Sequence, residues 1–384
     1  MRPLRRAPPV SLVRAAFLGL AVAAPLTLAV TAASCSTPSS SVDGGDLMGV
    51  YEKDAGADAA ADARAAKDGG KREKPQAVSA GPTKERKPVT GTCVAKQGEP
   101  DRELRRTLGR PACRGDEILE GKDADGSPRY ACVMGARGVE TRAPLPLIVF
   151  FHGPEGTPAT IDKRTAWKKL AAKFDVSGDP AHPGFIVLLP QGRLLKRDRT
   201  GAIFDTDHLG EGNVDVAAVD QFIDVLQKRG IVDRRRIYTV GESKGGWMAA
   251  TYAMWRADRI AAFATFASDA PPAVWTCEGV PPPPGLLLYR ACDAVTACES
   301  VEAWARAREK ASAETVSIRM GEGIGEELHC STKNKCSKGK GTANHERWPK
   351  GREEDILRFF AKHALSAGEE TPPAAPSATG EPAP

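Results

Sequence analysis

Short, predominantly apolar runs recur along the chain from residue 145 onward. They cover residues 145–151, 185–189, 237–240, 260–266 and 286–289, and a late strand is expected at 316–320. Because apolar and polar residues do not alternate within these runs, each run predicts a strand that is buried on both of its faces. A sheet of such strands needs covering layers on either side.

Stretches with helical spacing of apolar residues lie between these runs. They cover residues 165–174, 215–228, 299–310 and 353–363, and Asp215 is a candidate N-cap for the second of them. Strands that alternate with helices are typical of a mostly parallel sheet. The sequence therefore predicts an α/β fold with a mostly parallel central sheet and helices on both faces.

The first 34 residues differ in character from the rest. Four arginines fall within residues 1–14, and an apolar stretch follows at 15–33, which is typical of an export signal. Cys35 comes after small residues and before a polar run, so we expect it to be the lipid-modified first residue of a lipoprotein. Simple cleavage after Ala33 or Ser34, and retention of the segment as a membrane anchor, are the alternatives.

Composition separates two further regions from the core of the chain. Residues 35–90 are rich in Ala, Asp, Lys and Gly, and residues 366–384 are rich in Pro. Such stretches bury too little apolar surface to offset their ordering entropy, so we expect a disordered tether and a disordered tail. Residues 91–365 remain as one domain. A net charge of +5 over 384 residues gives no indication of nucleic-acid binding.

Export changes how the nine cysteines are interpreted. Eight remain besides Cys35, and an even number suits disulfides in an oxidising compartment. Cys292 is close enough in sequence to pair with Cys298, as is Cys330 with Cys336. Two more pairs would come from the other four, in an order that the sequence does not fix: Cys93, Cys113, Cys132 and Cys277. Without any C-x-x-C spacing, we expect no metal site.

The run 237–246 contains the pattern with the most chemical content. An apolar strand leads into Gly241-Glu242-Ser243-Lys244-Gly245, and a helix-like stretch follows. G-x-S-x-G between a strand and a helix predicts a nucleophile elbow, which exposes one serine hydroxyl above the end of the sheet. The alternative is an ordinary serine in a tight turn.

A nucleophilic serine needs a base and an orienting acid, which follow it in the order acid, then histidine. Asp293 comes almost directly after the strand at 286–289, and Asp269 is its rival. His345 precedes the closing helix in an expected loop, while His329 is the other candidate base. We expect His363 to be a surface residue of the closing helix.

Several of these motifs occur together in one known family. They are His152-Gly153 after the first strand, Pro190-Gln191-Gly192, the elbow, Asp293 and His345-Glu346-Arg347-Trp348-Pro349. Over about residues 129–365 the chain thus resembles exported polyhydroxybutyrate depolymerases and feruloyl esterases of the α/β-hydrolase fold. The resemblance implies a catalytic triad of Ser243, Asp293 and His345, with no metal and no cofactor.

Two departures bear on the oxyanion hole. Lys244 follows the serine, and its backbone N–H can still donate to an oxyanion. Pro154 follows Gly153, where a second donor is expected, and proline has no N–H. We therefore expect Gly153 or a neighbour to supply the second donor from a changed turn. His152 is interpreted as a structural turn residue.

Together these patterns predict an exported serine hydrolase that cleaves a carboxylic ester, either a small molecule or an oligomer. Its contact with a membrane would be the lipid at Cys35 alone, and otherwise it would be periplasmic or secreted. One alternative is a peptidase of the same fold. The other is a surface-binding lipoprotein that retains the fold with weak catalysis. The sequence predicts no oligomeric state.

Overall fold

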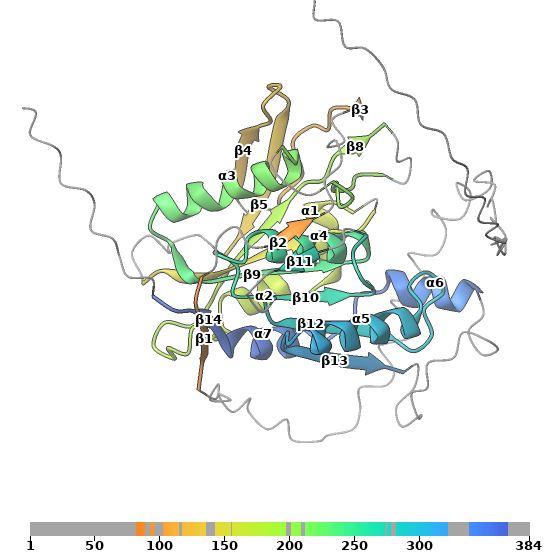
Figure 1. The fold of residues 1–384 in the computed structure, drawn as a ribbon. Helices are drawn as coiled ribbons and strands as arrows, with labels where there is room; N and C mark the ends of the chain where they lie inside the picture. Colours follow the sequence, from red (N-terminus) through yellow and green to blue (C-terminus); the bar gives the residue numbers. More distant parts are fainter. Residues whose placement is uncertain are drawn as a thin grey trace, which may run out of the picture. The chain divides into compact units, whose positions relative to one another are not determined.

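The computed structural model describes residues 82–88, 93–95, 103–114, 117–135, 143–154, 156–196, 201–208, 212–272, 275–277, 282–321 and 338–367. A central sheet is built from eight strands (Figure 1). These are β4 (Glu117–Lys122), β5 (Pro128–Met134), β6 (Leu145–Phe151), β7 (Ile186–Pro190), β9 (Val232–Glu242), β10 (Ala262–Phe266), β12 (Gly285–Arg290) and β13 (Thr315–Met320). Their order across the sheet is β13-β12-β10-β9-β6-β7-β5-β4.

The pairing of these strands identifies the fold. All neighbours from β7 to β13 run parallel, whereas β5 is antiparallel to both β7 and β4. The fully buried strands β6, β7 and β10 are among those that the apolar runs predict, because helices cover both of their faces. The late strand β13 lies at the edge of the sheet and is only partly buried, since Val316 is 38% exposed. Together with the strand-to-helix turn after β9, this arrangement is the α/β-hydrolase fold, and the predicted fold class is confirmed.

Six helices pack on the sheet in two layers (Figure 1). On one face lie α3 (Val214–Lys228), α4 (Lys244–Trp255) and α5 (Cys298–Lys310). On the other lie α1 (Pro158–Arg164), α2 (Trp167–Ala171) and α7 (Glu353–Ala361). Strand β6 contributes side chains to both faces, since Phe151 packs in the core beneath α3, α4 and α5, and Phe150 in the core beneath α1, α2 and α7.

Two strands far apart in sequence close the base of the domain. β1 (Lys84–Arg86) pairs in parallel with β14 (His363–Leu365). The Arg86 guanidinium also donates to the carbonyl oxygens of Ala257 and Ile260, at 2.8 and 2.6 Å. The prediction of a disordered tether over 35–90 is therefore wrong for residues 84–86. The prediction for His363 is also wrong, because it is 3% exposed and lies in β14, beyond the end of α7.

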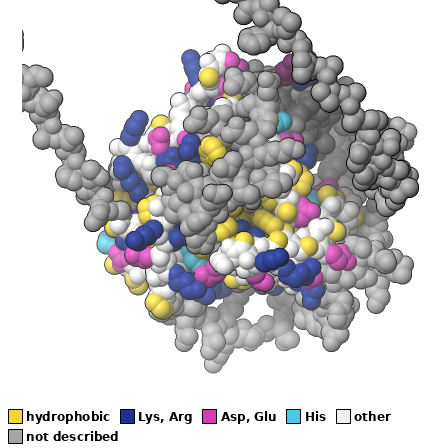
Figure 2. All heavy atoms as spheres, in the orientation of Figure 1, with side chains coloured by type: hydrophobic (Ala, Val, Ile, Leu, Met, Phe, Trp, Pro, Cys, Tyr) yellow, Lys and Arg dark blue, Asp and Glu magenta, His cyan; other side chains and the backbone are white. Residues whose placement is uncertain are grey.

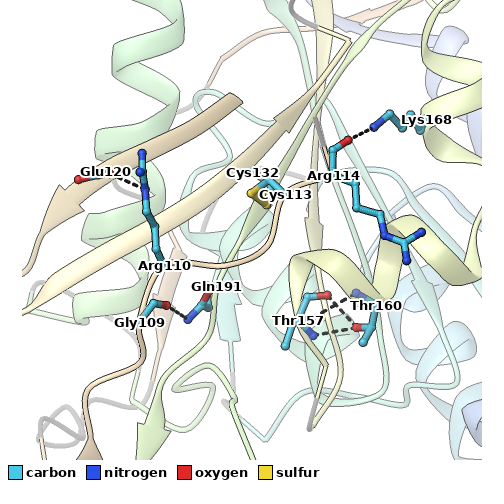
Figure 3. The surroundings of a disulfide bond; sticks show 10 residues. All are labelled: Gly109, Arg110, Cys113, Arg114, Glu120, Cys132, Thr157, Thr160, Lys168 and Gln191. Carbon is cyan, nitrogen blue, oxygen red and sulfur yellow. Dashed lines mark hydrogen bonds and ion pairs between the residues drawn. A yellow bond between two sulfur atoms is a disulfide. The ribbon is translucent and has the colours of Figure 1, made fainter. Parts of the chain in front are cut away.

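The segment before β4 is fastened to the sheet at several points. Cys113 forms a disulfide with Cys132 of β5 (Figure 3). Nearby, the Gln191 side chain donates to the carbonyl of Gly109 at 3.1 Å. A short antiparallel pair joins β3 (Leu104–Arg106) to β8 (Leu194–Leu195). These links hold residues 104–113 against the sheet and the segment after β7.

The other cysteines fall into three groups. Cys292 and Cys298 are both disulfide-bonded. Strands β2 (Cys93–Ala95) and β11 (Trp275–Cys277) pair with the backbones of Cys93 and Cys277 opposite each other. Cys35, Cys330 and Cys336 lie outside the described residues, so the pairing of the last two and the lipidation of the first stay predictions.

The start of α3 differs from its predicted form. Asn213, not Asp215, caps the helix by accepting from two backbone N–H groups. The Asp215 carboxylate instead lies fully buried between Arg193 and Arg129, with N···O distances of 2.9 and 2.6 Å. Burial alone would raise the pKa of Asp215, but the two guanidinium charges hold it well below its ordinary value. This ion cluster fixes α3 and the segment between β7 and β8 to the sheet.

The surface of the described residues is mixed in character. Figure 2 shows Lys and Arg side chains interspersed with Asp and Glu on the visible face. Among the described residues, no helix combines the length and the apolar composition that crossing a membrane requires.

Candidate active site

Ser243 stands on a strained turn between β9 and α4. Its backbone has φ 51° and ψ −129°, a region that non-glycine residues rarely adopt and that costs about 1–3 kcal/mol. The flanking glycines make the turn possible, since a Cβ at Gly241 would collide with the carbonyl of Gly245, and one at Gly245 with that of Phe151. The Ser243 N–H donates to the Phe266 carbonyl on β10 at 2.9 Å.

His345 lies directly beside this serine. Its Nε2 is 2.8 Å from Ser243 Oγ, and its Nδ1 is 2.9 Å from Asp293 Oδ2. A carboxylate only accepts, so Nδ1 carries the hydrogen and Nε2 is left to accept from the serine hydroxyl. The residue is 9% exposed. It lies in the last turn of α6 (Lys338–Glu346), not in the predicted loop.

Asp293 is held by the turn that follows β12. Its Oδ1 accepts from the N–H groups of Val295 and Thr296, each at 2.8 Å, which leaves Oδ2 facing the imidazole. The structure thus brings together the three residues that the sequence selects. The rival acid, Asp269, binds the Trp247 indole at 3.0 Å instead. His329 lies outside the described residues.

The residues after His345 explain the tryptophan in its motif. Trp348 is 3% exposed and packs between Phe150 and Phe266, with ring centroids 5.3 and 5.5 Å away. Its indole donates to the buried Glu353 carboxylate at 2.9 Å. The side chain therefore anchors the chain just beyond His345 to the core under the sheet.

His152 takes the structural role that the sequence suggests. Its Nδ1 donates to the Gly153 carbonyl at 2.8 Å, and its Nε2 accepts from the Gly192 N–H at 3.0 Å. Complete burial lowers the pKa of His152 to about 4, so the ring is neutral near pH 7. It joins the turn after β6 to the turn after β7.

In the turn after β6, the expected oxyanion donor is already engaged. Gly153 lies against the nucleophile, since a Cβ on it would be 3.4 Å from Ser243 Cβ. However, its N–H donates to the Glu242 carboxylate. Pro154 has no N–H, and the Gly156 N–H donates to the Gly153 carbonyl at 3.1 Å. Lys244 is the first residue of α4, so its N–H belongs to the donor-rich first turn.

Glu242 and Arg164 are site residues that the sequence interpretation missed. The Glu242 carboxylate is 8% exposed and forms a two-pronged ion pair with Arg164, at 3.0 and 3.2 Å. Burial raises the pKa of Glu242, against the opposing charge of Arg164. The available signal was an acidic residue inside the elbow motif itself. Arg164 carries no signal, because its partner lies 78 residues away.

The described part of the site contains no evident place for a metal. Within the described ranges, no three His, Cys, Asp or Glu side chains lie close enough together to hold an ion. The site's chemical groups are a hydroxyl, an imidazole and a carboxylate in series.

Comparisons with known proteins place the chain among distant neighbours. No protein-family model and no curated protein sequence matches it. A solved thermostable esterase is similar at 18% identity and a TM-score of 0.42, over 66% of this chain and 64% of that one, which is under two thirds of its length. The apo form of Thermogutta terrifontis esterase 2 is similar at 16% identity and a TM-score of 0.44, over 65% of this chain and 93% of that one. A Pyrobaculum calidifontis esterase is similar at 17% identity and a TM-score of 0.42, over 65% of this chain and 82% of that one.

Proposed function

We propose that this chain is a serine hydrolase that cleaves carboxylic esters by acyl transfer, as in the polyhydroxybutyrate depolymerase and feruloyl esterase family that it resembles. One observation carries the proposal. Ser243 Oγ, His345 and Asp293 form a continuous hydrogen-bonded series with distances of 2.8 and 2.9 Å. That series is what an alcohol needs in order to become a nucleophile near neutral pH.

The proposed reaction has two halves. His345 Nε2 takes the hydroxyl proton as Ser243 Oγ bonds to the ester carbonyl carbon, and the C=O electrons move to the oxygen. Collapse of this intermediate breaks the C–O bond to the alcohol, which leaves with the proton from His345. Water then attacks the acyl-serine with the same base and releases the acid. Asp293 holds the imidazole tautomer and stabilises its charged form.

The developing oxyanion needs donors beside Ser243. In the proposal the Lys244 N–H is the first and the Gly153 N–H the second. The second is held by the Glu242 carboxylate, so it must turn away from that partner to serve the substrate. Losing one such donor typically costs about 10²–10³-fold in turnover. We therefore expect a slow esterase.

The turn after β6 favours a second candidate, a surface-binding lipoprotein that keeps the fold and turns over weakly. Pro154 and the engaged Gly153 N–H support it. The two candidates differ in the fate of the serine once it is acylated. An enzyme releases product repeatedly, whereas a weak relative stops after the first event or does not react.

Labelling with a fluorophosphonate probe tests the proposal. Wild-type protein is compared with Ser243→Ala and with Ser312→Ala, a control serine that also has a positive φ of 58° but is exposed. We expect labelling of the wild type and of Ser312→Ala only. Turnover is then measured on short-chain, hydroxybutyrate and feruloyl esters, with peptide amides alongside. Folded wild type that takes no label would overturn the proposal, and preferred cleavage of amides would make it a peptidase.

We also propose that the chain is exported and lipid-anchored through Cys35. The signal-like residues 1–34 support export, and the polar run after Cys35 supports a tether. Full-length protein and a Cys35→Ala variant are expressed in a bacterial host and fractionated, with Ser36→Ala as control. We expect only Cys35→Ala to leave the membrane fraction. A wild type that is already soluble would indicate simple cleavage.

A further inference from the structure

Arg164 contacts both sides of the candidate site. From the end of α1 its guanidinium binds the two carboxylate oxygens of Glu242, at 3.0 and 3.2 Å. Its Nη2 also donates to the backbone carbonyl of Glu346. Glu242 immediately precedes Ser243, and Glu346 immediately follows His345. One side chain therefore joins the residue before the nucleophile to the residue after the base.

This bridge matters because Ser243 and His345 come from separate elements. They are 102 residues apart in sequence, yet their reacting atoms lie 2.8 Å from each other. Other contacts hold the end of α6 and the residues after it. Trp348 packs on Phe150 and Phe266, and two hydrogen bonds reach β12 and the turn beyond. Arg290 donates to the Arg347 carbonyl at 3.1 Å, and Asn344 donates to the Cys292 carbonyl at 2.7 Å.

We propose that Arg164 is a positioning residue that holds His345 against Ser243 and balances the Glu242 charge that the imidazole faces. The inference deepens the proposed hydrolase function and rests on it. A planar guanidinium can bind a carboxylate with two N–H groups and still donate to a carbonyl, which a lysine cannot do in the same geometry. The Arg164 side chain stays 37% exposed, so solvent reaches the bridge.

Charges around the pair come from several elements. Glu242 of β9 faces Arg164 of α1, His345 of α6 and the Gly153 N–H after β6. His345 faces Asp293 after β12 and Ser243 of the elbow, and it also interacts electrostatically with Glu242. Removing the Arg164 charge leaves an uncompensated carboxylate near the imidazole, which favours the protonated ring. Removing the Glu242 charge leaves an uncompensated guanidinium, which disfavours it.

Kinetics of five variants separate the geometric part from the electrostatic part. They are Arg164→Gln, Arg164→Lys, Glu242→Gln, the double Arg164→Gln/Glu242→Gln, and the control Lys163→Gln. The control removes an exposed charge from the preceding residue of α1. We expect Arg164→Gln and Arg164→Lys to lower kcat by about 10²-fold, with a far smaller change in KM. Lys163→Gln should match the wild type.

The acid limb of the pH profile of kcat/KM should move in opposite directions in Arg164→Gln and in Glu242→Gln. We expect it to rise by about 0.5–1 pH unit in Arg164→Gln, to fall in Glu242→Gln, and to return close to the wild-type position in the double variant. Arg164→Lys should keep the wild-type limb because it retains the charge. Melting temperatures of all variants identify any that are merely unfolded. An Arg164→Gln protein indistinguishable from Lys163→Gln would overturn the inference.

A second measurement does not depend on turnover. The His345 ring is titrated by NMR in a Ser243→Ala background, with and without Arg164→Gln, and the low-field Nδ1 proton is followed. We expect the titration to move upward and this proton to exchange faster when Arg164 is replaced. Unchanged values would overturn the inference even in an inactive protein. Failure of wild type to take the fluorophosphonate label counts only against the proposed function.

Discussion

Two histidines lie beside the elbow and differ in what their ring nitrogens bind. His152 binds a backbone carbonyl and a backbone N–H. His345 binds a serine hydroxyl and a carboxylate. Both rings are largely buried, at 1% and 9% exposure, so burial alone does not tell them apart.

The difference lies in whether a partner can exchange a proton with the ring. Backbone groups neither gain nor lose protons near pH 7, so the partners of His152 lock one neutral tautomer. In the proposed mechanism the hydroxyl of Ser243 passes its proton to His345, and Asp293 stabilises the charged ring that results. We therefore propose that its partners make His345 a base, whereas the backbone partners of His152 give that ring a structural role.

Replacing each histidine should give the largest contrast. We expect His345→Gln to lower kcat on the order of 10⁶-fold, because the serine loses its base. His152→Gln, normalised to the folded fraction, should still take the fluorophosphonate label. Labelling rate and circular dichroism are measured for both variants. Equal loss of labelling in folded His152→Gln would remove the distinction between the two rings.

The acid behind His345 should come next in size. We expect Asp293→Asn to lower kcat about 10⁴-fold, since an amide in this position favours the wrong tautomer. Asp269→Asn is the matched control, because Asp269 also follows a strand at this edge but binds the Trp247 indole. Steady-state kinetics on one short-chain ester check both. A larger loss of kcat in Asp269→Asn than in Asp293→Asn would make Asp269 the orienting acid.

The buried His152 should appear in the pH dependence of stability. Its pKa is lowered to about 4 in the folded chain, against an ordinary value near 6.5. The unfolded chain therefore binds a proton between these values that the folded chain does not. We expect about 3 kcal/mol of the free energy of unfolding to be lost as the pH falls from 6.5 to 4. Above pH 6.5 this contribution is complete.

Urea unfolding at pH 7 and pH 4.5 measures that loss. His152→Gln can still donate and accept but cannot titrate, so its stability should fall less over the same interval. His345→Gln is the companion variant for comparison. If His152→Gln retains the full wild-type slope, the loss belongs to other groups.

The turn next to His152 should give the smallest effect. Pro154→Ala adds a backbone N–H directly after Gly153. The Gly153 N–H is itself engaged by the Glu242 carboxylate, so the added group is a new oxyanion donor. We expect kcat to rise by up to about tenfold with KM little changed, which is part of what one oxyanion donor is worth. Steady-state kinetics and the labelling rate check the rise. A fall in kcat would mean that the rigid proline turn aids catalysis.

Much of the architecture could be predicted because its causes are local. Strands buried on both faces must be apolar throughout, so residues 145–151 and 185–189 indicate a covered parallel sheet without any knowledge of their partners. The elbow is also local, since glycines at 241 and 245 are needed wherever the backbone turns so sharply. Asp293 could be selected because it follows a buried strand directly.

Other features depend on partners far away in sequence. Asp215 has the sequence features of a helix cap, but Arg129, 86 residues earlier, draws its carboxylate into an ion cluster. β1 is three polar-looking residues that become a strand only because β14 offers an edge. Arg164 has no pattern of its own. Such roles arise from tertiary contacts, which no local window contains.

The β1–β14 pair has a practical consequence. Both strands contact β9. Arg235 binds Glu85 of β1 and donates to the Leu365 carbonyl of β14, and the Tyr238 hydroxyl donates to the His363 carbonyl. β9 then runs roughly 25 Å from Arg235 to Ser243 at about 3.3 Å per residue. The chain therefore enters and leaves the described domain at the end remote from the serine. A fusion joined directly before residue 82 or after residue 367 would therefore attach to the domain at the end remote from Ser243.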